Sequence, residues 1–425
     1  MTSRAAVVAI GLCVVVFSTL LGKDIWTDEV LHFALGSLDS TLEAWKTICR
    51  SQDINHGQTG IYMILDYWLL KLFGASRFWL RFPSFLSGFL LVFAAVHFFR
   101  GYKISPRWQI WGLLALYAQK WLMTFVGEAR PYLPLAATAV AALAYYSRAS
   151  DERGDRATRF LGYSGVLIGS IMHPYFAVCW GFSALLGYLL VAKRKNERPS
   201  VVSLWRHLNV PLCLLGSALY FGVGQFTWLS HKFGGGLDPF EYVGHGAQFF
   251  RVFVNAHFGF MGRLGMVGFL LLALFLGFFL SRQKGPRFII GQICAGPGAL
   301  MAGAFFLSLF VSWASWRSGY WILQRQWIVS FALVPIAATW LLANVESRLP
   351  LKFRSIFFGL TLVVILFQGA PWLLENVSSA KLQFTRKPRS YSEGAAPRTT
   401  DEFVVIANAN CDQGGPVWPI FKKFY

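Results

Sequence analysis

Long apolar runs dominate this chain and limit what it can fold into. They recur from end to end at roughly 18 to 22 residues each, the length of helix that crosses about 30 Å of hydrocarbon. Charged residues make up only 14% of the chain, whereas a soluble protein carries about 25%. We therefore predict an all-α fold, a polytopic membrane helix bundle of about 11 spans. The expected spans lie near residues 5–22, 79–99, 108–126, 131–147, 159–172, 174–192, 207–226, 263–280, 288–312, 326–343 and 355–372.

The segments between the spans alternate in charge, and this alternation predicts the orientation. Short basic loops lie on the same side as Arg4, and the positive-inside rule makes that side the cytoplasm. They read RGYKISPR, RASDERGDRATR, KRKNERPSVVSLWR, SRQKGPR and ESRLPLKFR. The longer, aromatic-rich loops then face outward. This basic rim accounts for much of the net charge of +19, so we expect membrane lipids and no nucleic acid as partners.

The expected organisation is one bundle and a short tail. The bundle covers residues 1–372, and its first outer loop is 23–78. Residues 5–22 look like a signal peptide, but no small-residue cleavage motif follows them, so we expect a retained span. Within the outer loop, GIYMILDYWLLKLF (60–73) is short and carries two charges, which favours an interfacial helix. Residues 373–425 form an external C-terminal tail. Two cysteines, Cys49 and Cys411, are expected outside, and whether they pair stays open.

An acidic pair, Asp28-Glu29, follows the first span in the stretch KDIWTDEVLHF. Alone, it is compatible with a solvated loop start. Other polar residues are also expected at the outer membrane boundary, where charged side chains are costly unless they face the protein interior or a ligand. These are Glu128, Arg130, Tyr132, His173, Tyr175, Arg317, Tyr320, Gln324 and Arg325. Arginines suit a phosphate, and a carboxylate can act as a base toward a hydroxyl, so the set fits a substrate with an anionic head and a hydrophobic tail.

The histidines do not predict a metal site. None occurs in a His-Glu-x-x-His or paired-cysteine spacing, although Asp28 and His32 are four residues apart and can share a helical face. We expect no required cofactor, while a divalent cation held by carboxylates and a phosphate stays open. The outer loop 227–262 contains the glycine run FGGGLDP and His257, for which no motif predicts a role.

Several stretches, in order, resemble the GT-C superfamily of integral-membrane glycosyltransferases. The likeness is to the bacterial branch related to protein O-mannosyltransferases and to aminoarabinose and arabinofuranosyl transferases. It covers about the first 190 residues and again about 315–345. The matching stretches are WTDEVLHF, INHGQTGIYMILDYWLLKLFGASRFWLRFPSFLSGFLLV, GEARPYLPL and LQRQWIVSFALVPIAA.

The resemblance implies roles for residues that match these motifs. Asp28 would deprotonate the acceptor hydroxyl, and Glu29 would support Asp28 or bind sugar. Arg130 and Arg325 would hold the donor phosphate, with Tyr132 and Gln324 beside them, and His56 would line the donor site. The chain departs from the family in having Gly57-Gln58 where a Pro-Pro pair follows the histidine, and Gln326 where a tyrosine follows the arginine.

The sequence therefore predicts an inverting glycosyltransferase. It would move a sugar from a polyprenyl-phosphate carrier to a hydroxyl of a cell-envelope glycolipid, polysaccharide or surface protein. We expect an integral protein of a bacterial inner membrane, with the N-terminus cytoplasmic and the active site and C-terminus external. Two alternatives remain: a transporter or flippase of a lipid-linked sugar, and an envelope-assembly protein without chemistry.

Overall fold

The fold was analysed in a computed structural model of the chain. It describes residues 35–49, 62–74, 76–119, 125–149, 156–173, 210–220, 257–261 and 327–384, together with Glu29, His32 and a few other isolated positions. All regular structure in these residues is helical, as expected. The helices are α3 (Thr41–Cys49), α4 (Tyr62–Phe73), α5 (Arg77–Gly101), α6 (Pro106–Ala118), η3 (Phe125–Gly127), α8 (Tyr132–Ala149), α9 (Arg156–Met172), α12 (Val210–Tyr220), η5 (Gly259–Met261), α18 (Ile328–Arg348) and α19 (Leu351–Phe384).

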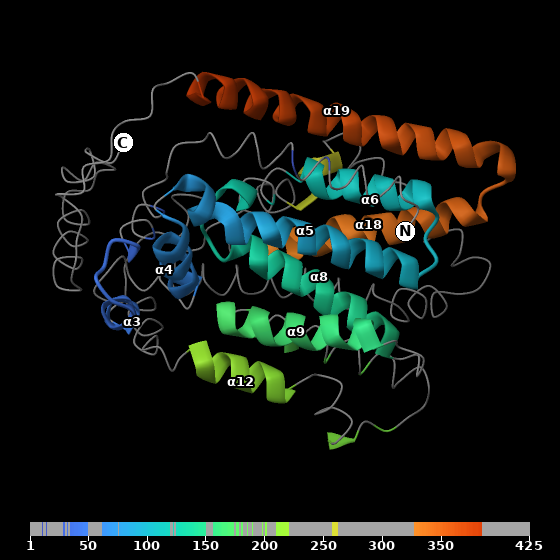
Figure 1. Cartoon of the computed structure of the whole chain (residues 1–425). Coiled ribbons are helices and arrows are strands. Elements are labelled where there is room, and N and C mark those ends of the chain that lie inside the picture. The colour runs from blue at the N-terminus through green and yellow to red at the C-terminus, as the bar shows by residue number, and fades with distance from the viewer. Residues whose placement is uncertain are drawn as a thin grey trace, which may run out of the picture.

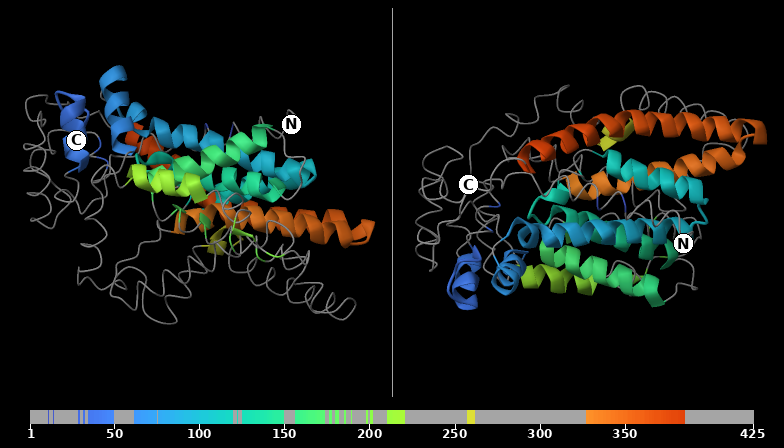
Figure 2. Two further views of the ribbon diagram at one scale, coloured as in Figure 1. Left: turned by 90° about the horizontal axis from the view of Figure 1, so that it is seen from below. Right: turned by 45° about the horizontal axis from the view of Figure 1, so that its top comes forward.

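The helices form a layered bundle (Figure 1). α8 lies at its centre and packs against α5, α9 and α18, while α12 covers the far side of α9. On the opposite side α19 runs along α6 and α18, so that α12 and α19 form two edges of the bundle (Figure 2). The short helices α3 and α4 lie at one end of α5. This end carries the polar residues described below.

In the described part of the chain, three helices are long and apolar enough to cross a membrane: Arg77–Gly101, Ile328–Arg348 and Leu351–Gly369. They coincide with three of the expected spans, and the protein is an integral membrane protein. The first two are mostly buried in the bundle, whereas only 6% of the third is buried, and apolar side chains such as Phe367 and Val363 are exposed on its surface. In a membrane such a face can contact the lipid hydrocarbon, because the helix satisfies its own backbone hydrogen bonds and the side chains are apolar. The count of about 11 spans stays a prediction, because much of 174–326 lies outside the described residues.

The core of the bundle depends on close helix approach at α8. Its sequence, YLPLAATAVAALAYYSRA, is rich in alanine, and its side chains from Leu133 to Ala144 are buried. Small side chains let neighbouring helix backbones come close. In lipid the hydrophobic effect does not drive helix association, so helices associate through this close van der Waals packing. α6 contributes the large counterparts, Trp108 and Trp111, whose ring centroids are 5.4 Å apart. At the end of the bundle away from α4, the Glu346 carboxylate of α18 accepts from Trp108 Nε1 (2.8 Å) and pairs with Arg107 (2.7 Å).

Two helix ends differ from the sequence expectation. The helix expected over 108–126 ends at Ala118, and a 3-10 turn covers Phe125–Gly127. Gln119 leaves helical geometry, and its side chain donates to the carbonyl oxygen of His257 at 3.0 Å. At the other end of the chain, α19 continues to Phe384, past the point where the tail is expected to begin. The division into a bundle and a tail stays a prediction.

Candidate functional site

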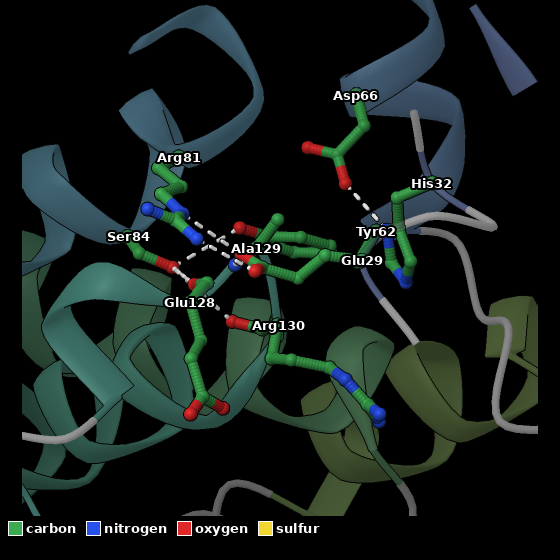
Figure 3. Close-up of polar contacts among 9 residues, drawn as sticks. All are labelled: Glu29, His32, Tyr62, Asp66, Arg81, Ser84, Glu128, Ala129 and Arg130. Atoms are coloured by element: carbon green, nitrogen blue, oxygen red, sulfur yellow. Dashed lines mark hydrogen bonds and ion pairs between the residues drawn. The ribbon is translucent and has the colours of Figure 1, made fainter. Parts of the chain in front are cut away.

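Glu29, the second residue of the acidic pair, is buried and held by three hydrogen bonds. The Arg81 guanidinium of α5 donates to both carboxylate oxygens, from Nε to Oε1 at 3.0 Å and from Nη2 to Oε2 at 2.8 Å (Figure 3). The backbone N–H of Ala129 donates to Oε1 at 2.7 Å. Glu29 is 1% exposed and Arg81 is fully buried. A buried ion pair is tolerated only with such geometry, because both ions have lost their hydration.

These bonds join three segments that are distant in sequence. Glu29 comes from the segment before α3, Arg81 from the start of α5, and Ala129 from the GEARPY stretch before α8. Ser84, one turn after Arg81, strengthens the same junction. Its hydroxyl donates to the carbonyl oxygens of Glu128 (2.5 Å) and Arg130 (3.3 Å), and the Tyr62 hydroxyl of α4 lies 3.2 Å from it. The acidic segment and the Arg130 segment are therefore held together.

A second buried pair, His32 and Asp66, lies beside this junction. His32 Nδ1 is 2.6 Å from Asp66 Oδ2, and the edge of the His32 ring contacts the Tyr62 ring at a centroid distance of 5.9 Å. Asp66 is fully buried, and its second oxygen, Oδ1, has no hydrogen-bond partner among the residues that the structure describes. Burial raises the pKa of Asp66 to about 6, although the bond and charge of His32 oppose this; the nearby Glu29 carboxylate adds to the rise. Burial and the Asp66 charge also raise the pKa of Tyr62 well above its ordinary value.

Arg130 and Glu128 extend from the junction in other directions. Figure 3 shows both side chains pointing away from the Glu29–Arg81 pair. Arg130 is 3% exposed, its guanidinium lies over the ring of Tyr132 at 5.8 Å, and it approaches the Tyr132 hydroxyl at 3.5 Å. Contact with an aromatic ring orients a guanidinium. The junction thus presents one arginine that is committed to Glu29 and one that is supported by a tyrosine.

Four expected site residues belong to the two segments that the junction joins: Glu29 on one side, and Glu128, Arg130 and Tyr132 on the other. His173 lies elsewhere, at the end of α9, where its ring is 6.1 Å from that of Tyr220 in α12. The other expected residues lie outside the described part of the chain. They are Asp28, His56, Tyr175, Arg317, Tyr320, Gln324 and Arg325, and also Cys411 of the open cysteine pair. Their roles stay predictions.

No sequence motif predicts a role for Arg81, Ser84 or Asp66. A signal for two of them was available, because Arg81 and Asp66 are charged residues inside apolar segments, where an unpaired charge is costly. That cost predicts that each has a partner inside the protein. Ser84 carries no comparable signal, because a serine in a span also bonds readily to its own helix backbone.

His257 is a core residue. Its Nε2 is 2.7 Å from Ser330 Oγ, and its ring contacts Trp327 and Phe331. Because the Ser330 hydroxyl donates to the carbonyl oxygen of Trp327 at 2.8 Å, His257 Nε2 is the donor to Ser330. Within the described residues no group of three or more His, Cys, Asp or Glu side chains is arranged to hold a metal ion. Metal dependence therefore stays open.

Comparisons with known proteins place the fold. No protein-family model matches the chain, and no curated protein matches it by sequence. Among solved structures, the chain is similar to ArnT from Cupriavidus metallidurans bound to undecaprenyl phosphate, with a TM-score of 0.53 and 13% sequence identity; the match covers 100% of this chain and 78% of that one. The apo form of the same protein matches with a TM-score of 0.49, 14% identity, and 98% and 76% coverage. The chain therefore has a fold like that of ArnT, in agreement with the fold that the sequence resemblance implies.

Proposed function

We propose that the protein is an inverting glycosyltransferase that takes a sugar from a polyprenyl-phosphate carrier. The acceptor is a hydroxyl of a cell-envelope glycolipid, polysaccharide or surface protein, on the outer face of the membrane. The observation that carries the proposal is the fold likeness over the whole chain to a protein crystallised with undecaprenyl phosphate. The junction of Glu29, Arg81 and Ala129 supports it, because it holds the acidic segment against the segment of Arg130.

In the proposed reaction, Asp28 removes the proton of the acceptor hydroxyl. The oxygen attacks the anomeric carbon, the bond from that carbon to the phosphate oxygen breaks, and its electron pair leaves with the polyprenyl phosphate. Because the leaving group gains negative charge, it needs cations more than a general acid, a role for Arg130 and Arg325. Glu29 is fixed by Arg81 and Ala129, so we assign it the support of Asp28 rather than sugar binding. His56, Tyr132 and Gln324 complete the donor site.

The test uses purified protein in lipid with a panel of undecaprenyl-phosphate sugars: arabinofuranose, mannose, glucose and aminoarabinose. Release of the lipid phosphate is followed for the wild type, for Asp28→Asn, and for Asp39→Asn as a matched control on an exposed acid of the same loop. We expect release from one donor, a loss of about 10²-fold or more in Asp28→Asn, and no change in the control. A chelator arm reports whether a divalent cation is required.

Other results would point to the alternatives. Tight binding of one donor without release would favour a transporter of the lipid-linked sugar. Full turnover by Asp28→Asn would move the base to another residue, with Glu128 the next candidate at the junction.

A further inference from the structure

The bond to Asp66 selects one tautomer of the neutral His32 ring. Because Asp66 Oδ2 lies 2.6 Å from His32 Nδ1, the proton of the neutral imidazole is on Nδ1, and the lone pair is on Nε2. Figure 3 shows this second nitrogen on the side of the ring away from Asp66. Among the described residues, none forms a hydrogen bond with it. The arrangement is that of a histidine prepared to accept a proton.

The pair is poorly explained as a structural anchor alone. An anchor of α4 gains most when all its polar atoms are bonded, as they are for Glu29, whose two oxygens accept from Arg81 and Ala129. Within the described residues, Asp66 instead keeps one fully buried oxygen without a hydrogen-bond partner, and no hydrogen bond is formed with His32 Nε2. Buried polar groups left unsatisfied in this way are uncommon and are concentrated at functional sites.

Among the described groups around Asp66, His32 is the one that pairs directly with its carboxylate. From the first outer loop, Glu29 faces it, but that carboxylate is compensated by Arg81 of α5. Tyr62 of α4 itself is neutral, because its pKa is raised well above the ordinary value. On α3, which also packs on α4, Glu43 and Lys46 pair with each other in an exposed position. Arg77 starts α5, and Lys71 extends from the α4 surface over the Tyr67 ring. His32 is therefore the direct partner through which Asp66 acts.

We propose that His32, with Asp66 as its positioning residue, receives the proton that the acceptor hydroxyl loses during sugar transfer. The inference rests on the proposed function. The proton passes from the hydroxyl to Asp28, four residues before His32 in the sequence, and then to the Nε2 lone pair of His32. The imidazolium that forms is stabilised by the Asp66 carboxylate, and its proton is released to water after the lipid phosphate leaves. One bond to the anomeric carbon forms and one breaks, because the new glycosidic bond replaces the sugar–phosphate bond.

The experiment measures kcat and donor KM against pH for the wild type, His32→Gln, Asp66→Asn and Glu43→Gln. We expect His32→Gln to lower kcat by about 10²-fold with little change in donor KM, and Glu43→Gln, a carboxylate change on the neighbouring helix, to have no effect. The wild-type kcat should fall as pH drops through about 6, where Asp66 takes up a proton. Asp66→Asn should be slow at all pH values and lack this limb.

Each other outcome contradicts a specific step. If His32→Gln or Asp66→Asn keeps wild-type kcat, the dyad is not in the proton path, although the transferase stands. If His32→Gln raises donor KM alone, the role is binding and the inference fails. If Asp66→Asn is slower but keeps the acid limb, Asp66 acts only through folding. If the wild type releases no lipid phosphate from any donor, the proposed function fails first and the proton path with it.

A measurement on the wild type guards against variants that fail to fold. Diethyl pyrocarbonate modifies a neutral imidazole with a free ring nitrogen, and peptide mass spectrometry reports His32 separately from the other seven of the eight histidines. We expect modification at pH 7 that slows at least severalfold when undecaprenyl phosphate is bound. No modification, or modification that the lipid phosphate does not slow, would place His32 Nε2 outside the site and overturn the inference.

Discussion

The stability of the junction depends strongly on the buried ion pair between Glu29 and Arg81. Both side chains are buried, so removing one partner leaves an uncompensated charge away from water. We expect Arg81→Met or Glu29→Gln to lower the free energy of unfolding by about 3–5 kcal/mol. Thermal unfolding of the purified protein in detergent measures this. Lys46→Gln, which breaks an exposed pair with Glu43, should cost less than about 1 kcal/mol, and equal effects of the buried and exposed changes would contradict the assignment.

Because burial raises the pKa of Asp66, the stability of the folded protein should depend on pH, and the direction of that dependence follows from the shift. Its pKa is raised in the folded protein, from 3.8 to about 6, so the fold prefers the protonated carboxyl. The stability this contributes is fully present below about pH 4 and is lost as pH rises through 6, by about 3 kcal/mol in all. The difference in melting temperature between the wild type and Asp66→Asn should therefore shift against the wild type between pH 4 and pH 6.5. A difference that is constant across that range would mean that Asp66 is not perturbed by burial.

At the residue scale, the sequence indicates which buried charges need a partner. It does not indicate which residue that partner is. The charges of Asp66 and Arg81 stand out inside apolar segments. Their partners are 34 and 52 residues away, His32 and Glu29, and charge alone would equally allow Asp66 to pair with Arg81. The choice is made by how α4 and α5 are placed, which a hydropathy pattern does not contain. The structure brings Glu29 into contact with Ala129, the residue before Arg130, and the roles that motif likeness implies for Glu29 and Arg130 stay predictions.

At the scale of the helices, hydropathy predicted the long spans and missed where some helices end. The span expected at 79–99 is Arg77–Gly101, bounded by the Ser76 cap, whose hydroxyl accepts from Trp79 N–H at 3.3 Å. The end of α6 at Ala118 gave no such signal, because the apolar run continues through KWLMTFVG. That break is fixed by a tertiary contact, the bond from Gln119 to the His257 carbonyl, 138 residues away. Local patterns predict helices, while distant contacts decide some of their ends.

Helix packing depends on glycine where α12 meets α9. A Cβ added at Gly216 would lie 2.5 Å from Ser170 Cβ and 2.9 Å from the Leu167 carbonyl oxygen, so the α9 backbone would have to move. We expect Gly216→Ala to lower stability by about 1–3 kcal/mol. The matched control is Gly359→Ala on the exposed face of α19, where nothing lies within 4 Å and the change should be neutral or slightly stabilising. Melting temperatures of the two variants check this, and equal values would exclude close packing at Gly216.

At the scale of the whole molecule, the two ends of α5 differ in charge, and this difference predicts which end faces the cytoplasm. The junction of Glu29 and Arg81 lies at the start of α5, and the basic turn with Lys103 and Arg107 follows its other end. A span of 25 residues is about 38 Å long, so these two ends are separated by the full hydrocarbon thickness. The positive-inside rule then predicts that the junction is external and the basic turn cytoplasmic.

This orientation can be tested with single cysteines on a background in which the six native cysteines are replaced. A membrane-impermeant maleimide applied to intact spheroplasts should label Leu42→Cys, on an exposed position of α3, and should leave Ser105→Cys unlabelled until the membrane is opened. Ser105 suits the test because it is exposed and its side chain makes no capping bond. Lys352→Cys, in a second basic loop, should behave as Ser105→Cys does. The reverse pattern would put the junction in the cytoplasm and remove an external acceptor from the proposed reaction, because Glu29, Arg130 and the acceptor must share one side of the membrane.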